Sequence, residues 1–303
     1  MTTVAHTRAR TRAAGTKLPY LFLLLPMLFL GVVVFYPLGR EIWISFTDAA
    51  ISNPNGGDFI GLANYREVLA SPQLRQSLGV TVLYTAATVV ASLVLGVISA
   101  LAVDRPFPGR AIARAILLFG WAVPNVAAAL IWTWMYNQQS GILNKIVTSL
   151  GGTSLGWLTD SNLAIWSVTL TTVWQVTPFV MLTTLAALQG VPPELREAAR
   201  IDGADPLNVF RTATLPHIRP AIGLSALLAT VWTIRRFEII YLLTGGGPLG
   251  TTSTLVIQLR REAFENYDLG AAATFGVVGL VVSLLVTAVY FAFERRTKEG
   301  SAS

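Results

Sequence analysis

Residues 197–216 read EAARIDGADPLNVFRTATLP, a charged segment between two long apolar runs. Pro192 and Pro193 stand just before it, and proline fits the first turn of a helix. Gly203 can adopt the left-handed conformation that ends a helix, and the side chain of Asp205 can cap the next one. The pattern predicts two short helices joined by a glycine hinge, in water and between two membrane spans.

The second of these helices is expected to begin at Pro206 and to stop before Pro216. One interpretation of the segment is an amphipathic hairpin that lies on lipid headgroups. The other is a docking element, because Ala198 and Ala199 are small enough for close approach to a groove on another protein. The residues alone leave both open. A DNA-binding helix-turn-helix is disfavoured, since the segment is held between two spans.

The composition is that of an integral membrane protein. Hydrophobic residues make up 53% of the 303 residues and charged residues 13%, against about 25% charge in soluble domains. The chain has no cysteine, which excludes a disulfide framework and thiol chemistry. The net charge of +6 would suit nucleic acid or lipid headgroups. Its placement along the chain is better explained by membrane topology, and no nucleic-acid partner is expected.

Apolar runs long enough to cross a bilayer predict an all-α protein with six transmembrane helices. A short exterior helix is expected around Asn64–Ala70. Five runs are uninterrupted, and a sixth, Pro220–Leu243, contains Arg235, Arg236 and Glu238. The five are Leu18–Gly39, Ser77–Val103, Ala115–Asn144, Ser161–Val191 and Leu269–Phe293.

The basic residues predict the orientation of the protein in the membrane, because cytoplasmic loops carry an excess of Lys and Arg. Fourteen of the 22 basic residues fall on one face of the six-span layout: Arg8, Arg10, Arg12, Lys17, Arg105, Arg110, Arg114, Arg196, Arg200, Arg211, Arg219, Arg295, Arg296 and Lys298. The other face holds Arg40, Arg66, Arg75, Lys145, Arg260 and Arg261, interspersed with acids. Both termini are therefore expected in the cytoplasm, as tails 1–17 and 297–303 around a membrane domain 18–296.

The segment also resembles the EAA loop of ABC importer permeases. Glu197-Ala198-Ala199, Gly203 and Leu215-Pro216 match that motif in kind and spacing. Ala213 departs from it, where the family often has isoleucine. Three further stretches resemble the carbohydrate-uptake permeases related to the maltose importer: FIGLANYREVL (59–69), WAVPNV (121–126) and LLTGGGP (242–248). The likeness covers residues 18–296.

The resemblance implies the type I ABC importer permease fold, in a bacterial cell membrane. It implies a loop at 192–217 that docks into a cytoplasmic ATPase, with these coupling residues: Glu197, Ala198, Ala199, Asp202, Gly203, Asp205, Leu215 and Pro216. The chain contains no G-x-x-x-x-G-K-[ST] phosphate loop. No cofactor is therefore expected in this chain, and ATP and Mg are expected on two partner ATP-binding subunits. A second homologous permease and an external substrate-binding protein complete the implied importer.

Polar residues and prolines inside the spans mark the expected pathway, because the membrane interior is polar where function requires it. Pro124 and Pro178 fall at similar depths, near mid-bilayer, and each frees a backbone carbonyl. Arg235 and Glu238 are three residues apart and could pair. Arg236 has no acid within helical reach, so its donors are expected to be free for a ligand.

The resemblance places sugar contacts at Trp121, Asn125, Thr172, Gln175, Val176, Phe179, Ala229, Thr233 and Arg236, and Trp232 lies one turn from Arg236. Such polar residues could instead hold helices together. The arginines leave open an anionic ligand of the glycerol phosphate type. A self-sufficient ion-coupled transporter using Arg235, Arg236 and Glu238 is a disfavoured alternative. No catalytic residues and no metal site are expected, since His6 and His217 are isolated.

The orientation can be tested with single cysteines, because the natural chain has none. We expect Asp205→Cys to react with a membrane-impermeant thiol reagent in inverted vesicles and not in intact cells. The control Arg66→Cys should show the reverse pattern. Labelling of Asp205→Cys in intact cells would overturn the predicted orientation.

Overall fold

A computed structural model describes residues 18–53 and 57–300, and the predicted tail 1–17 lies outside the described residues. The described chain is mostly helical. Its β-structure is limited to isolated β-bridges, and the described residues form no strands. The first half contains α1 Leu18–Leu30, the π-helix η1 Gly31–Phe35, α2 Tyr36–Ile44, α3 Ala63–Ala70, α4 Pro72–Asp104, α5 Arg110–Ala122, α6 Asn125–Met135 and α7 Ile142–Ser149. The second half contains α8 Ala164–Gln189, α9 Pro193–Ile201, α10 Pro206–Val209, the π-helix η2 Phe210–Thr214, α11 Leu215–Ile234, α12 Glu238–Thr244, α13 Leu255–Phe264 and α14 Leu269–Gly300.

The number of membrane-spanning segments agrees with the six predicted spans when the bent pair of α5 and α6 is taken as one span. Five continuous stretches are long and apolar enough to cross a bilayer: Phe22–Ile44, Pro72–Asp104, Ala164–Gln189, Pro206–Ile234 and Leu269–Ala292. The sixth is the pair α5 and α6, which is bent by 102° at Val123–Pro124. A short helix is present where the sequence predicts one, as α3.

Two sequence predictions about helix ends are wrong. The predicted fifth span Pro220–Leu243 ends at Ile234, and α12 is a separate helix. The chain does not leave its helix before Pro216, because α11 begins at Leu215 and continues through Pro216 and Pro220. The π-helical turn η2 runs directly into α11, with the N–H of Leu215 bonded to the carbonyl of Phe210 five residues earlier, so the helix reaches Pro216 without a break.

Pro178 does not break α8, which is helical from Ala164 to Gln189. The carbonyl freed by Pro178 belongs to Trp174, four residues earlier. A Cβ on Gly120 would lie 2.6 Å from this carbonyl oxygen, so glycine is required for α5 to pack there. Gly120 thus lets α5 pack directly over the carbonyl that Pro178 frees.

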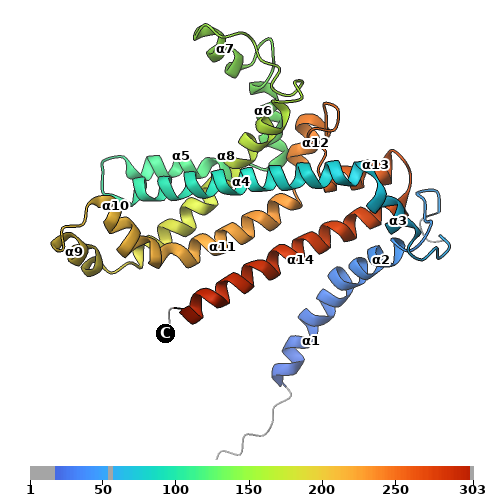
Figure 1. The fold of residues 1–303 in the computed structure, drawn as a ribbon, viewed down its shortest axis with the longest axis horizontal. Helices are drawn as coiled ribbons and strands as arrows, with labels where there is room; N and C mark the ends of the chain where they lie inside the picture. Colours follow the sequence, from blue (N-terminus) through green and yellow to red (C-terminus); the bar gives the residue numbers. More distant parts are fainter. Residues whose placement is uncertain (1–17, 54–56, 301–303) are drawn as a thin grey trace, which may run out of the picture.

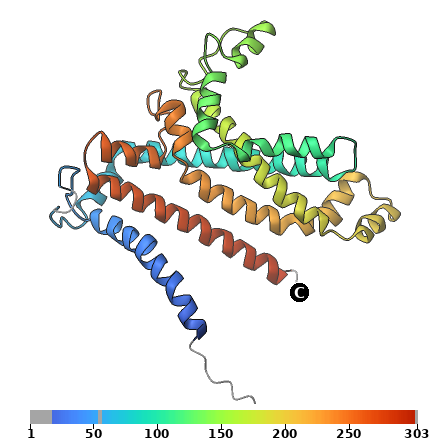
Figure 2. The same ribbon diagram turned by 180° about the vertical axis from the view of Figure 1, so that it is seen from behind.

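The core is built around α4 and α8, with α5 and α11 beside them (Figures 1 and 2). One apolar cluster joins Val89, Val176, Val180 and Ala229 from α4, α8 and α11. In contrast, the first span has no buried residue over Phe22–Ile44. Figure 1 shows α1 standing away from the bundle. This span is therefore left for lipid or another chain to cover.

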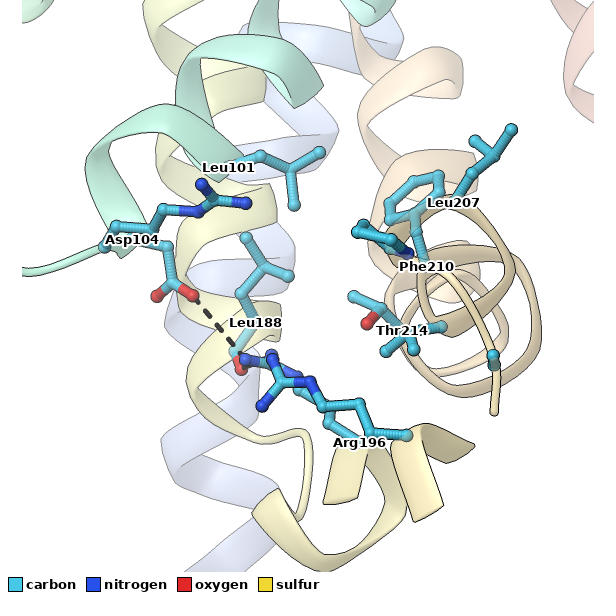
Figure 3. A pocket seen from close by; sticks show the side chains of 12 residues that line it. Leu101, Asp104, Leu188, Arg196, Leu207, Phe210 and Thr214 are labelled. Carbon is cyan, nitrogen blue, oxygen red and sulfur yellow. Dashed lines mark hydrogen bonds and ion pairs between the residues drawn. The ribbon is translucent and has the colours of Figure 1, made fainter. Parts of the chain in front are cut away.

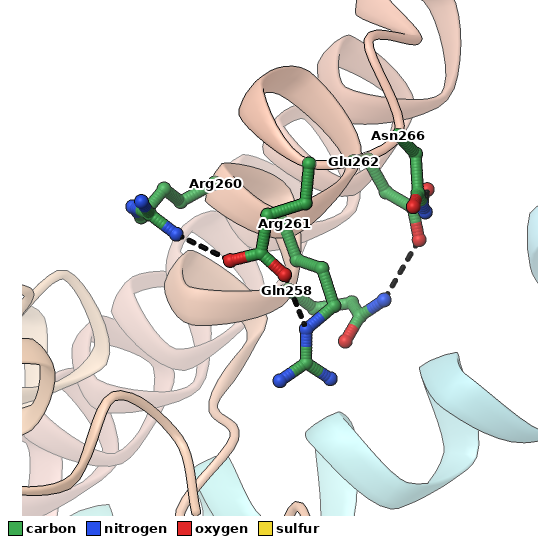
Figure 4. Close-up of polar contacts among 6 residues, drawn as sticks. Gln258, Arg260, Arg261, Glu262 and Asn266 are labelled. Carbon is green, nitrogen blue, oxygen red and sulfur yellow. Dashed lines mark hydrogen bonds and ion pairs between the residues drawn. The ribbon is translucent and has the colours of Figure 1, made fainter.

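The two ends of the bundle differ in how their arginines are paired. α9 and α10 lie at one end, and α2, α3 and α13 lie at the other (Figures 1 and 2). On α13, Arg260 and Arg261 both form ion pairs with Glu265, at 2.6 and 3.4 Å (Figure 4). At the α9 end the structure gives one ion pair, between Arg196 and Asp104 at 3.8 Å. The excess of uncompensated positive charge therefore lies at the α9 end.

The close packing of α4 on α8 generates a test with a matched control. A Cβ on Gly96 would lie 2.5 Å from the Cβ of Val180, whereas a Cβ on Gly79 of the same helix meets no atom within 4 Å. We expect Gly96→Ala to destabilise the protein by about 1–3 kcal/mol through overpacking. Gly79→Ala should be neutral or slightly stabilising, since alanine favours the helix. Thermal unfolding of the purified variants compares the two, and equal melting temperatures would contradict this packing.

Candidate functional site

The break between α5 and α6 creates an irregular stretch of backbone inside the bundle. Val123 has extended backbone angles, as expected for a residue before proline. Its carbonyl oxygen accepts a hydrogen bond from Nε2 of Gln175 on α8, at 3.2 Å. Backbone groups without helical partners are costly in hydrocarbon, so this side-chain donor stabilises the break.

The amide of Gln175 connects three elements. Its Nε2 also donates to Oδ1 of Asn125, the first residue of α6, at 2.9 Å. Its Oε1 accepts a hydrogen bond of 2.6 Å from a terminal guanidinium nitrogen of Arg236, just beyond α11. The Gln175 side chain is buried. Elements separated by 50 and 61 residues from Gln175 in the chain therefore meet at one amide.

Arg236 differs from its prediction in one respect. Its donors are not all free, because one of them binds Gln175. Its Nε is buried and has no hydrogen-bond partner, which leaves a donor unused. Charge-assisted hydrogen bonds are stronger than neutral ones, so this bond fixes the arginine firmly beside Gln175.

The predicted pairing of Arg235 with Glu238 is not present among the described ion pairs. The reason is the helix end at Ile234, because residues three apart lie on one face within a continuous helix. Arg235 is exposed and lines a groove of about 720 Å³ between α2, α11 and α14. Glu238 begins α12 and is also exposed.

Three aromatic rings gather beside this polar group. Trp121 of α5 stacks on Phe179 of α8, with ring centroids 5.3 Å apart. Trp232 of α11 lies 5.6 Å from Trp121 and 4.8 Å from Phe179. Trp121 remains 44% exposed, so one broad aromatic face is open to a ligand.

The aromatic and polar residues form two layers. Each aromatic residue is four positions in the sequence from a polar one: Trp121 and Asn125, Phe179 and Gln175, Trp232 and Arg236. The α8 pair lies one helical turn apart, whereas the other two pairs span the end of a helix. In α5 and α11 the aromatic residue precedes its partner, and in the oppositely directed α8 it follows (Figure 1). All three rings therefore lie on the side of the polar layer that faces the α9 end.

The remaining predicted pathway residues are buried around these layers. Val176, Ala229 and Thr233 are at most 1% exposed, and the hydroxyl of Thr233 donates to the carbonyl of Ala229. Thr172 bonds the hydroxyl of Tyr84 on α4 at 2.8 Å. These four residues support the site from behind and present little surface to a ligand.

Sequence reasoning missed Tyr84, although it is fully buried and polar. Its hydroxyl contacts Thr172 of α8, one turn from Val176. The available signal was a tyrosine in the middle of an apolar span, because a buried tyrosine hydroxyl usually requires a partner.

The EAA-like segment is an exposed projection at the end of the bundle. α9 begins at Pro193, and Gly203 has a left-handed φ of +81° between α9 and α10. The carboxylate of Asp205 accepts a 2.7 Å hydrogen bond from the backbone N–H of Asn208. The predicted hinge and cap are thus confirmed as local geometry.

Most of the other predicted coupling residues are exposed. Glu197, Ala198, Asp202 and Pro216 are exposed, whereas Ala199 and Leu215 are partly buried. Ile201 is 86% exposed, and Leu195 and Leu207 of the same segment are 41% and 55% exposed, so several apolar side chains face outward together. An outer face of this kind is suited to contact with another protein.

No group of three or more His, Cys, Asp or Glu residues suited to a metal ion occurs in residues 18–53 and 57–300.

Comparison with protein families gives one match over residues 92–299, more than half of the chain. The matching model is described as "Binding-protein-dependent transport system inner membrane component".

Individual relatives extend this likeness to nearly the whole chain. A trehalose/maltose transport system permease protein of Thermococcus litoralis is 36% identical over 277 residues, covering 90% of this chain and 92% of the relative. A sulfoquinovosyl glycerol transport system permease protein of Agrobacterium fabrum is 33% identical over 277 residues, covering 91% and 90%. Among solved structures, a bacterial ABC transporter involved in import of the acidic polysaccharide alginate aligns with a TM-score of 0.80 and 19% identity. That alignment covers 92% of this chain and 95% of the other.

The role of Gln175 can be tested by a double-mutant cycle. Gln175→Leu removes the hydrogen-bond partners of Val123, Asn125 and Arg236, and we expect a loss of about 1–3 kcal/mol in stability. The control Thr169→Val removes a buried hydroxyl that bonds to its own helix alone, and should cost less. Combining Gln175→Leu with Arg236→Leu should cost less than the sum of the single changes. Strictly additive effects on the melting temperature would exclude the coupling.

Proposed function

The chain belongs to the family of binding-protein-dependent transport system inner membrane components, and we propose that it is the permease subunit of an ATP-driven carbohydrate importer. The observation that carries this proposal is the meeting of the α5–α6 break and the end of α11 at Gln175 of α8, inside the spans. Polar groups at such depth are expensive unless they serve a pathway. Relatives named for transport of trehalose, maltose and a sulfoquinovosyl glycerol support a saccharide as the cargo.

The two layers suit a sugar in chemical terms. Asn125, Gln175 and Arg236 carry amide and guanidinium groups for hydroxyls, and the exposed face of Trp121 can pack on the C–H face of a pyranose ring. Arg236 can donate to a hydroxyl or to an acidic group. Arg236 therefore does not select between neutral and acidic saccharides. We propose a carbohydrate as the cargo without choosing between these two kinds.

Energy is proposed to enter through the exposed segment around α9. Residues Glu197, Ala198, Ala199, Asp202, Gly203, Asp205, Leu215 and Pro216 would contact an ATP-binding subunit or set the geometry of that contact. From Pro206 to Ile234 the chain is one continuous helical stretch, with η2 near its start. A movement of the docked segment would therefore be carried along α11 to Trp232 and Arg236 at its far end.

The proposed cycle is alternating access between two permease subunits. Closure of two ATP-binding subunits would turn the pathway outward, and the saccharide would pass from an external binding protein to the site beside Gln175. The basic α9 end would face the cytoplasm, in line with the positive-inside rule. The uncovered first span is available for contact with the second permease or with lipid.

Reconstituted importer can test both parts of this proposal. We expect Arg236→Ala to lower uptake of the binding protein's ligand about tenfold or more, since it removes a charged donor. Assembly and basal ATP hydrolysis should persist. Arg235→Ala is the matched control, because Arg235 is exposed outside the site.

Substitutions of Gly203 test the proposed coupling of the exposed segment to ATP hydrolysis. Gly203→Pro cannot adopt the observed φ of +81°, so it should abolish stimulation of ATP hydrolysis by the loaded binding protein. Gly203→Asn tolerates the left-handed conformation and should retain stimulation. Failure of the wild-type chain to co-purify with an ATP-binding subunit would refute the proposed function. Normal uptake by the Arg236→Ala variant would refute the proposed saccharide site beside Gln175 and leave the proposed importer function standing.

A further inference from the structure

A second cavity lies behind the exposed segment, at the ends of α4 and α8. Its volume is about 810 Å³, within the range of about 300–1,000 Å³ typical of ligand pockets. Leu101 and Leu188 form one wall, and Leu207, Phe210 and Thr214 form the other (Figure 3). The last two belong to η2. The cavity is separate from the site at Gln175, because none of its lining residues belongs to that site.

The charge of this cavity is strongly positive. Arg105, Arg196 and Arg200 line it, with Asp104 as the one acidic lining residue. Arg196 reaches Asp104 at a long 3.8 Å, and its Nε is buried without a partner. Among the described residues, Arg105 and Arg200 make no side-chain hydrogen bond or ion pair. Three guanidinium groups thus face one carboxylate.

The position of the cavity indicates where an occupant would come from. α4 ends at Asp104 and α8 at Gln189, so the cavity lies where two membrane spans leave the bilayer. Leu101 and Leu188 of its apolar wall lie in the last turn of these spans, and its three arginines follow the span ends in the sequence. Basic pockets at such places bind anionic lipid headgroups. The basic N-terminal segment of this chain, with Arg8, Arg10 and Arg12, has the wrong charge to fill it.

We propose that this cavity binds an anionic phospholipid from the adjoining leaflet. The phosphate lies among Arg105, Arg196 and Arg200, and the first acyl carbons lie between Leu188 and Phe210. Arg196 immediately precedes Glu197 of the exposed segment. The bound lipid therefore braces α9 against the end of α4, and lipid composition affects the energy-coupling segment.

Photolabelling in nanodiscs tests this site directly. The assembled complex is placed in phosphatidylcholine discs that contain phosphatidylglycerol with a diazirine near the start of one acyl chain. After irradiation, mass spectrometry maps the labelled peptides. We expect labelling at residues 101–105 and 207–214. Each of Arg105→Gln and Arg196→Gln should lower it about five-fold, as expected for about 1 kcal/mol per arginine.

Control variants separate lipid binding from a structural role of Arg196. Arg196→Lys keeps the charge and should retain most labelling, and Arg219→Gln, an exposed arginine outside the cavity, should have no effect. Asp104→Asn removes the ion pair but leaves the three arginines, so labelling should persist or increase. An equal loss in Asp104→Asn and Arg196→Gln would overturn the proposal, because it would make the ion pair itself the determinant.

Three other outcomes would also overturn it. Equal labelling by the matching phosphatidylcholine probe would show a non-selective apolar gap. Displacement by millimolar soluble glycerol 3-phosphate would show a site for free phosphate compounds. Labelling that appears in the isolated chain and is lost on addition of the ATP-binding subunits would make the cavity a protein interface.

Discussion

The hydrogen bonds of Gln175 join two interrupted elements to the continuous helix α8, at points where unpaired polar groups would be costly in hydrocarbon. The α5–α6 break exposes the carbonyl of Val123, and the end of α11 places a guanidinium inside the bundle. One neutral amide serves both, because its nitrogen donates and its oxygen accepts. The rest of the architecture follows from keeping α8 straight enough to present this amide. Gly120 contributes to that by allowing α5 to pack over the carbonyl freed by Pro178.

The same helices connect the site to the end of the molecule. Trp232 and Arg236 stand at one end of the long stretch that begins at Pro206, and the glycine hinge stands just before its other end. The π-helical turn η2 lies between them and packs against α9. π-Helical turns occur often at functional positions, where a helix must be adjustable. A rigid span with one adjustable turn near its base is suited to transmit a small movement over the length of α11.

The two ends of the helix bundle differ in how their charged side chains are paired. Near α13, arginines are neutralised by Glu265, and glutamine and asparagine side chains bond Glu262. Near α9, several arginines have no acidic partner among the described residues. Unpaired surface charges contribute little to stability. Their concentration beside an exposed helix and a basic cavity therefore points to contacts with lipid headgroups and other chains.

Much of this protein could be predicted from local chemistry. Apolar runs gave the spans, and Gly203 and Asp205 gave the hinge and its cap, because hydropathy and backbone preference depend on neighbouring residues in the chain. The break at Pro124 was predictable for the same reason. The tertiary structure alone decided the 102° bend, the continuity of α8 through Pro178, the separation of Arg235 from Glu238, and the binding of Arg236 to Gln175. Each of these depends on which helix lies opposite, and no spacing within one segment specifies that.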